Sequence, residues 1–195
     1  VPEQFTMQTQ KDLCLAHPKG GIMNIDVLSF GRLAYRVFEE VGQDARVVLD
    51  DEGKNLVLRK IAGECEKDLK VFKGNLKKQG YISEVKSVLS EFAQYGVDFE
   101  RLDDFMKEVP PESYLHYKLD DIRTIYEKFE EYLSEKYITK EEMLDVLSDA
   151  VPYSDILKGS VVAMDGFTGF TPVQNRLIGE LFSVCEKVMI TVTMD

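Results

Sequence analysis

The chain has 195 residues, 44% hydrophobic and 30% charged, which is enough for one globular domain with a sizeable core or for one domain carrying an insertion. It contains neither an apolar run of the ~20 residues that a transmembrane helix needs nor a signal peptide, so we expect a cytoplasmic protein without a membrane partner. Cys14, Cys65 and Cys185 lie far apart and form no CxxC or Cys/His pattern, which indicates neither a disulfide framework nor a zinc site.

The formal net charge of −11 is concentrated in one part of the chain. Residues 98–157 carry 17 acidic and 7 basic residues, whereas residues 1–97 carry 14 of each and residues 158–195 carry 4 acidic and 3 basic residues. The negative charge therefore describes a solvated helical module and does not exclude a nucleic-acid partner for the rest. Because the chain begins with Val1-Pro2-Glu3-Gln4 and no initiator Met, we expect that it was cut from something longer.

The first part of the chain predicts an α/β beginning. We expect Val1 at the end of a strand and residues 4–15 in a turn and short helix, before the break at residues 18–21. Residues 25–30 form a second candidate strand. Apolar residues at helical spacing then predict a helix that stops at Gly42.

About a hundred residues of helices follow. Residues 50–52 place carboxylates at a helix N-terminus, and a stripe of apolar residues predicts a helix that ends at Gly96. The strongest helix is predicted over residues 112–137, with apolar steps of four and three at Leu115, Leu119, Ile122, Tyr126, Phe129 and Leu133. Thr139 and Glu142 have the spacing of a capping box for a helix to about Ala150.

The α/β pattern returns after Pro152. Residues 161–164 are a short apolar run typical of a fully buried parallel strand, residues 172–185 predict a helix, and residues 188–192 predict a β-branched strand. We therefore predict one α/β parallel-sheet domain made of residues 1–45 and 151–195. An all-α subdomain is inserted at residues 46–150.

Asp165 follows the 161–164 strand directly, where ligands of open α/β sheets gather. It stands where magnesium and phosphate would be held, while Gly166 stands where a nucleotide-hydrolysing motor would carry a second acid. An ordinary strand-end turn also accounts for Asp165. The chain has no GxxxxGK[ST] loop, and neither His17 nor His116 neighbours a plausible nucleophile, so we assign no catalytic residue and no metal site beyond this degenerate position.

Two aromatic segments suit single-stranded nucleic acid. Phe30, Arg32 and Tyr35 stand at a predicted strand-to-helix junction, where Arg can fork to phosphate or guanine and Tyr can stack on a base. The glycines on both sides of Phe167 let a ligand approach and leave Phe167 and Phe170 accessible for stacking. The structural alternatives are an Arg lying along a helix beside a core Tyr, and two core phenylalanines.

Gln4 and Thr6 offer polar groups just after the first predicted strand. Either side chain can bond base edges or phosphates. A turn with a helix cap explains both residues equally well.

Four segments taken together strongly resemble the N-terminal region of the AddB (RexB-like) family, the second of the two subunits of the bacterial ATP-dependent helicase/deoxyribonuclease AddAB. They are, in this order, VPEQFTMQTQ, DVLSFGRLAYRV, LVLRKI and VVAMDGFTGFTPVQNRLI. The resemblance covers the whole chain, although residues 98–157 match only in pattern. It implies a P-loop, UvrD-like helicase fold, here without its first strand and phosphate loop. It also implies that motor function resides mainly in an AddA-like helicase-nuclease partner.

The resemblance further implies a function. The family scans unwound single-stranded DNA and recognises the Chi hotspot while double-strand DNA ends are processed for recombinational repair. By position, the residues that fall in its Chi-reading channel are Gln4, Thr6, Phe30, Arg32, Tyr35 and Phe167. Asp165 falls at the degenerate nucleotide and magnesium (Walker B) position, and relatives carry Trp where Tyr35 stands. ATP with magnesium and a 4Fe-4S cluster are implied for the full-length parent, and no cofactor is expected in this chain.

Two other functions remain open from the residues. An active superfamily-one helicase ATPase would need a phosphate loop upstream and an acid able to replace Gly166. A structural interaction module would use the acidic helices of residues 98–157 to dock a basic partner.

Overall fold

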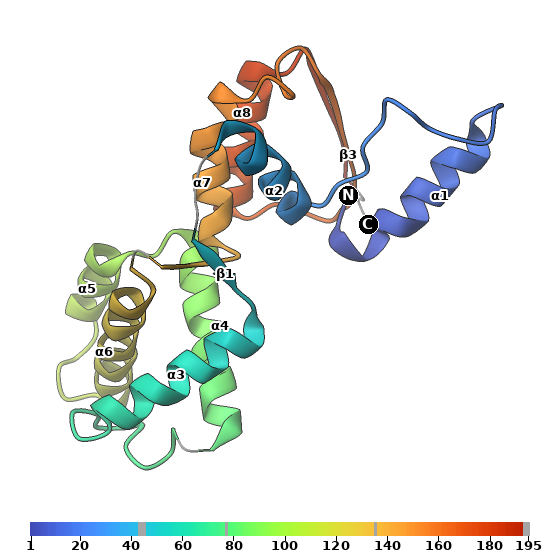
Figure 1. Ribbon diagram of the computed structural model, residues 1–195. Helices are drawn as coiled ribbons and strands as arrows, with labels where there is room; N and C mark the ends of the chain where they lie inside the picture. The colour runs from blue at the N-terminus through green and yellow to red at the C-terminus, as the bar shows by residue number, and fades with distance from the viewer. Residues whose placement is uncertain (43–45, 77, 135, 193–195) are drawn as a thin grey trace. The chain divides into compact units, whose positions relative to one another are not determined.

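The computed structural model describes residues 1–42, 46–76, 78–134 and 136–192 (Figure 1). The chain divides into two compact units, one of Val1–Asp44 with Met143–Asp195 and the other of Ala45–Glu142. The boundary that we predicted at residue 45 lies outside the described residues. The second unit ends before the predicted boundary at residue 150, so nearly all of the helix at 142–150 belongs to the first unit.

The first unit combines helices with a pair of parallel strands. Its elements are η1 (Glu3–Phe5), α1 (Thr6–Ala16), α2 (Phe30–Val41), α7 (Glu142–Ala150), η2 (Val151–Tyr153), β3 (Val161–Phe167), α8 (Pro172–Val184) and β4 (Lys187–Val192). Strands β3 and β4 pair in parallel, with Val161 opposite Lys187 and Met164 opposite Ile190. The two strands and the crossover helix α8 predicted for this end of the chain are therefore confirmed.

Strand β3 is less buried than predicted. Only Met164 of this strand is buried, and Val161 is 57% exposed. Within the described residues β3 pairs with β4 alone, and from 161 to 165 its more exposed and less exposed residues alternate. The prediction of a fully buried strand is wrong here because a parallel strand is buried only when neighbours cover both of its faces.

Residues 25–29 do not form the predicted strand. They have no strand partner within the described ranges, and helix α2 already begins at Phe30. The Ser29 hydroxyl caps this helix by accepting a hydrogen bond from the Arg32 backbone N–H (3.4 Å), and Gly42 ends it in the left-handed conformation. The strand prediction failed because an apolar run becomes a strand only where a second strand pairs with it.

The second unit is mainly helical. It contains β1 (Val47–Leu49), α3 (Asp51–Cys65), α4 (Gln79–Tyr95), α5 (Phe99–Glu108), α6 (Tyr114–Leu133) and β2 (Tyr137–Thr139). Strands β1 and β2 pair in parallel, which corrects our prediction of an all-α insertion. Three residues per strand are too few to produce a readable alternation. None of the helices in the described part of the chain is both long and apolar enough to cross a bilayer.

The predicted helix caps of this unit are present. The Asp50 carboxylate accepts a hydrogen bond from the backbone N–H of Gly53 (2.7 Å). Thr139 and Glu142 form the reciprocal bonds of a capping box, since each backbone N–H donates to the other side chain (2.7 and 3.2 Å). Helix α6 is shorter than predicted because Ser113 caps its start and because residues 137–139 belong to β2.

A buried carboxylate anchors the loop after α3 to α6. The Asp121 side chain is 1% exposed and accepts hydrogen bonds from the backbone N–H groups of Lys70, Val71 and Phe72 at 2.8, 2.7 and 2.8 Å. Beside it lies the apolar core shared by α3, α4 and α6, which includes Leu58, Ile61, Cys65, Phe72, Ile82, Leu89, Ile125 and Phe129.

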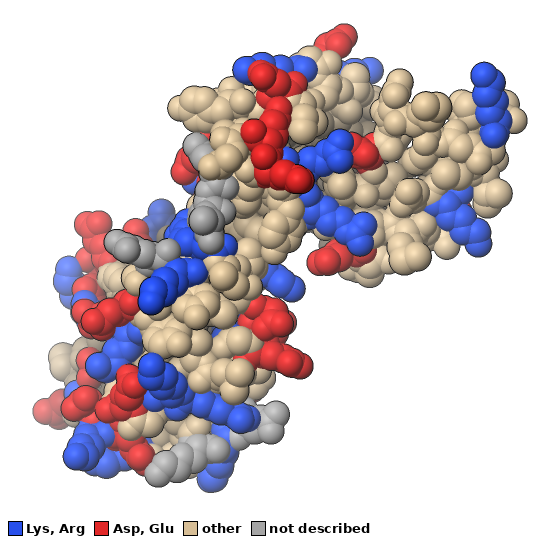
Figure 2. Space-filling view, in the orientation of Figure 1, with Lys and Arg blue, Asp and Glu red and all other residues tan. Residues whose placement is uncertain are grey.

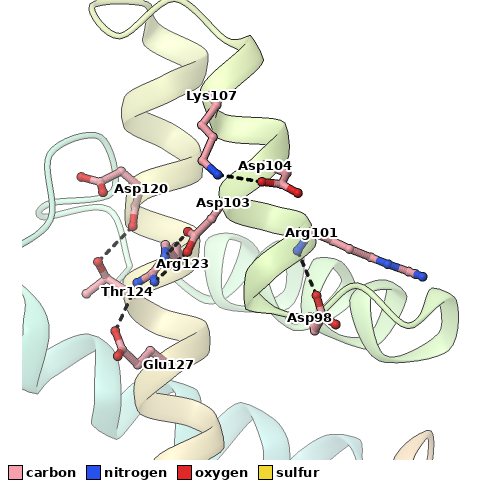
Figure 3. Close-up of polar contacts among 9 residues, drawn as sticks. All are labelled: Asp98, Arg101, Asp103, Asp104, Lys107, Asp120, Arg123, Thr124 and Glu127. Carbon is pink, nitrogen blue, oxygen red and sulfur yellow. Dashed lines mark hydrogen bonds and ion pairs between the residues drawn. The ribbon is translucent and has the colours of Figure 1, made fainter.

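Several acidic residues of α5 and α6 are engaged in local contacts (Figure 3). Asp98 caps α5 by accepting from the Arg101 backbone N–H (2.9 Å), and Lys107 pairs with Asp104 (2.7 Å). Arg123 donates from Nε and Nη2 to the two oxygens of Asp103 at 2.5 and 3.2 Å, and this contact lowers the pKa of the Asp103 carboxyl. Figure 2 shows positive side chains interspersed among the negative ones over this unit, so its acidity is partly balanced locally.

We predict that Asp121→Ala lowers the free energy of unfolding by about 3 kcal/mol, because three backbone N–H groups lose their acceptor. Asp120→Ala is the matched control, since Asp120 pairs with Lys70 at the surface, and its loss should stay within about 0.5 kcal/mol. Urea unfolding followed by circular dichroism measures both variants. Equal losses would contradict the anchoring role of Asp121.

We also predict a stability change with pH that depends on Glu130. Burial, with a smaller contribution from Glu142, raises the pKa of Glu130 from 4.5 to about 7. The folded state therefore keeps a proton that the unfolded chain has lost, so the free energy of unfolding falls as pH rises through this range and stays low above it. In Glu130→Gln, the difference between the urea midpoints at about pH 5 and about pH 8 should shrink. In Glu131→Gln, which changes an exposed neighbour, the difference should persist.

Candidate nucleic-acid interface

Three segments that are far apart in the sequence meet at the carboxyl end of β3 (Figure 1). The amino group of Val1 donates a hydrogen bond to the carbonyl of Leu28, just before α2 (3.0 Å). A Cβ atom at Gly166 would lie 3.6 Å from Cδ of Pro2 and 3.7 Å from Cδ2 of Phe5. Residues 1–5, the start of α2 and the end of β3 therefore form one site.

Three phenylalanines form a ring cluster in this site. The ring centroid of Phe167 lies 5.3 Å from that of Phe30 and 5.1 Å from that of Phe170, and each pair is tilted by 38°. Such tilted contacts are favourable for aromatic pairs. All three residues are partly exposed, so the cluster is neither a closed core nor a fully open surface. Its exposed part is of a kind on which a base can stack.

Arg32 and Tyr35 lie on the solvent side of α2. Ala34 and Val37 of the same helix are fully buried, whereas Arg32 is exposed and Tyr35 is 57% exposed. Within the described residues the Arg32 guanidinium makes no ion pair, and only the Arg32 backbone is engaged, by the Ser29 cap. The structure therefore leaves both the cation and the phenol ring open to a ligand.

Gln4 and Thr6 have different surroundings. Gln4 is exposed. Thr6 is only 3% exposed, and its hydroxyl donates a hydrogen bond to the carbonyl of Glu3 (3.0 Å). Thr6 thus stabilises the turn from η1 into α1, and its hydroxyl is already bonded within the chain.

Asp165 is exposed at the end of β3, where its carboxylate accepts a hydrogen bond from the Thr191 hydroxyl on β4. Burial lowers the pKa of the Val1 amino group, and the charge of Asp165 opposes that change. Magnesium in nucleotide sites is held by one or two carboxylates together with phosphates and water. No three His, Cys, Asp or Glu side chains gather as a metal site in the described ranges, so Asp165 offers a single carboxylate ligand.

Hydrogen bonds fix the helices that flank this site. The Glu40 carboxylate, near the end of α2, accepts from the Ser154 hydroxyl (2.5 Å) and from the backbone N–H of Ile156 (2.9 Å). These bonds tie α2 to the segment that leads into β3. At the start of α8, Thr171 and Gln174 form a complete capping box. The ring cluster therefore joins the first residue of α2, the last residue of β3 and the segment just before α8.

Phe5 is the residue of this site that sequence reasoning missed. It is 47% exposed and lies beside Gly166, so it borders the end of β3. A signal was available, because an aromatic residue stands between Gln4 and Thr6, the two residues that we predicted as polar contacts.

Comparisons with known proteins point to one family. The family described as "ADDB, N-terminal" matches residues 1–195. The second subunit of the ATP-dependent helicase/deoxyribonuclease of Lachnoclostridium phytofermentans is 48% identical over 195 residues, and the proteins of the same name from Alkaliphilus metalliredigens and Thermoanaerobacter sp. are 37% and 38% identical over 195 residues. Each comparison covers 100% of this chain, and the chain spans 17% of the length of these relatives.

Proposed function

This chain belongs to the AddB N-terminal family, and from that premise we propose that it is the part of a helicase-nuclease that binds and scans single-stranded DNA. It would act in the cytoplasm beside an AddA-like helicase-nuclease partner, in the processing of double-strand DNA ends for recombinational repair. The relatives support this proposal because their names describe the second subunit of an ATP-dependent helicase/deoxyribonuclease.

The observation that carries the proposal is the convergence of exposed aromatic and cationic side chains at the end of β3. The ring cluster of Phe30, Phe167 and Phe170 offers partly exposed aromatic surface, and Arg32 and Tyr35 extend from the neighbouring helix. Bases stack on aromatic rings whatever their sequence, while a guanidinium binds phosphate oxygens. Base stacking together with phosphate contacts suits a DNA strand that moves through the site.

Recognition of Chi needs contacts to base edges in addition to stacking. The exposed amide of Gln4 can donate to and accept from a base edge, and Arg32 can donate two parallel hydrogen bonds to guanine. Tyr35 would stack on a neighbouring base. We propose that Thr6 contributes indirectly, because its bonded hydroxyl holds the turn that presents Gln4.

We propose further that the nucleotide site of this chain is degenerate. Asp165 would be the one carboxylate ligand of a magnesium ion, which would offset phosphate charge, but position 166 is Gly and cannot polarise a water. The ATP hydrolysis that drives unwinding would then occur in the AddA-like partner. A 4Fe-4S cluster is proposed only for a longer parent protein.

We predict that Arg32→Ala and Phe167→Ala each weaken binding of a fluorescent single-stranded oligonucleotide at least about fivefold, which is the low end of the effect of one stacked base. Fluorescence anisotropy of the purified protein gives the dissociation constants. If Arg32 contacts a phosphate, its loss also lowers the slope of log affinity against log salt by about 0.7, whereas Phe167→Ala leaves the slope unchanged.

Matched controls come from exposed residues outside the site. Arg59→Ala on α3 and Phe182→Ala on α8 remove side chains of the same types and should leave the affinity for DNA unchanged. If Arg32→Ala and Phe167→Ala bind like the unaltered protein, the site does not bind DNA and the interaction-module hypothesis stands.

We predict that the purified protein shows no ATP hydrolysis stimulated by single-stranded DNA. The 195 residues contain no GxxxxGK[ST] loop to hold a triphosphate, and Gly166 stands where the second acid would be needed. A coupled assay of phosphate release with and without oligonucleotide measures this. Turnover that depends on DNA and is abolished by Asp165→Ala would show an active motor instead.

A further inference from the structure

The pairing of β3 with β4 is interrupted by a β-bulge just before Phe167. Met164 lies opposite Ile190 and Phe167 lies opposite Val192, so β3 advances by three residues where β4 advances by two. One extra residue is therefore accommodated in β3. Gly166, inside this step, has φ of +79°, in the left-handed region that favours glycine.

The bulge decides on which face of the strand Phe167 lies. In a regular strand, residues 161, 163, 165 and 167 would share one face, which is the more exposed face of β3. The extra residue reverses the alternation, so Phe167 takes a register position equivalent to that of the buried Met164. There its ring meets that of Phe30 at 5.3 Å.

The requirement for glycine at position 166 is a matter of backbone conformation more than of space. A Cβ atom there would make ordinary van der Waals contacts with Pro2 and Phe5, at 3.6 and 3.7 Å. The positive φ is what an L-residue other than Gly or Asn rarely adopts. A Glu in this position would have to take the same left-handed conformation or remove the bulge.

We propose that Gly166 is the positioning residue of the DNA-binding site: its bulge turns Phe167 toward Phe30 and so builds the stacking surface offered to a base. This inference rests on the proposed function. In a motor, position 166 would carry a catalytic acid. In this chain, the glycine at this position sets the direction of the Phe167 side chain. Gly166 acts through Phe167 and does not itself contact DNA.

The test compares four variants in binding single-stranded DNA that carries 2-aminopurine, whose fluorescence is quenched when the base stacks. Phe167→Ala and Gly166→Ala should each lose at least about fivefold in affinity and most of the quenching. Gly166→Asn should bind and quench like the unaltered protein, because Asn tolerates the left-handed conformation. The double variant Gly166→Ala/Phe167→Ala should bind with the same affinity as Phe167→Ala alone, since Gly166 acts through the Phe167 ring.

Gly159→Ala is the matched control for backbone strain. Gly159 has φ of +69° in the same unit, and a Cβ there would meet no atom within 4 Å, so this variant should keep its DNA affinity. If Gly166→Ala does not fold, the test rests on Gly166→Asn. A loss of 2-aminopurine quenching in Gly166→Asn equal to that in Phe167→Ala would overturn the inference.

The remaining outcomes distinguish the positioning role of Gly166 from the proposed DNA-binding function. Full binding by Gly166→Ala together with weak binding by Phe167→Ala, or additive losses in the double variant, would overturn the role of Gly166 and leave the proposed function intact. Full binding by Phe167→Ala would overturn the proposed function itself.

Discussion

The parallel pairing of β3 with β4 is the interaction on which the candidate site depends. It sets Asp165 beside Thr191 and, through the bulge, sets Phe167 beside Phe30. Helix α8 connects the two strands, and its Leu177 and Leu181 are fully buried, so the crossover is packed firmly. Every candidate residue at the end of β3 therefore owes its direction to a register of main-chain hydrogen bonds rather than to its own side-chain preference.

Both units bury apolar side chains, but helix α1 of the first unit is largely exposed. The second unit has a continuous apolar core and adds buried polar anchors to it, such as Lys54, which donates to Glu141 (2.6 Å) and to Ser90 (3.2 Å). In the first unit, helix α1 buries only Thr6. Exposed apolar and aromatic side chains are costly to keep in water, so a surface that retains them is of the kind that binds a partner. The proposed DNA interface lies in this first unit.

Local patterns in the sequence predicted the helices well. Helices α2 and α4 each end at a glycine in the left-handed conformation, and α3 starts directly after Asp50, which caps it. These signals are local, because a cap contacts residues within one turn of itself. Most of the predictions that failed concern strands, namely the strand end at Val1, residues 25–30, the short pair β1 and β2, and the burial of β3; the end of α6 was also predicted too late in the chain. A strand is stabilised by a neighbour that is distant in the sequence, and no local pattern identifies that neighbour.

The sequence by itself determined the family, through the segments VPEQ, SFGRLAYRV and MDGFTGFTP, and it showed that glycine stands at position 166. Only the tertiary structure decided that Phe5 borders the site, that Thr6 is buried, and that Phe167 turns toward Phe30. For Phe5 and Phe167, the physical reason is that their contacts join positions more than a hundred residues apart, or depend on one extra residue in a strand. Periodicity describes which face of an element is apolar, but the register between elements fixes what each side chain meets.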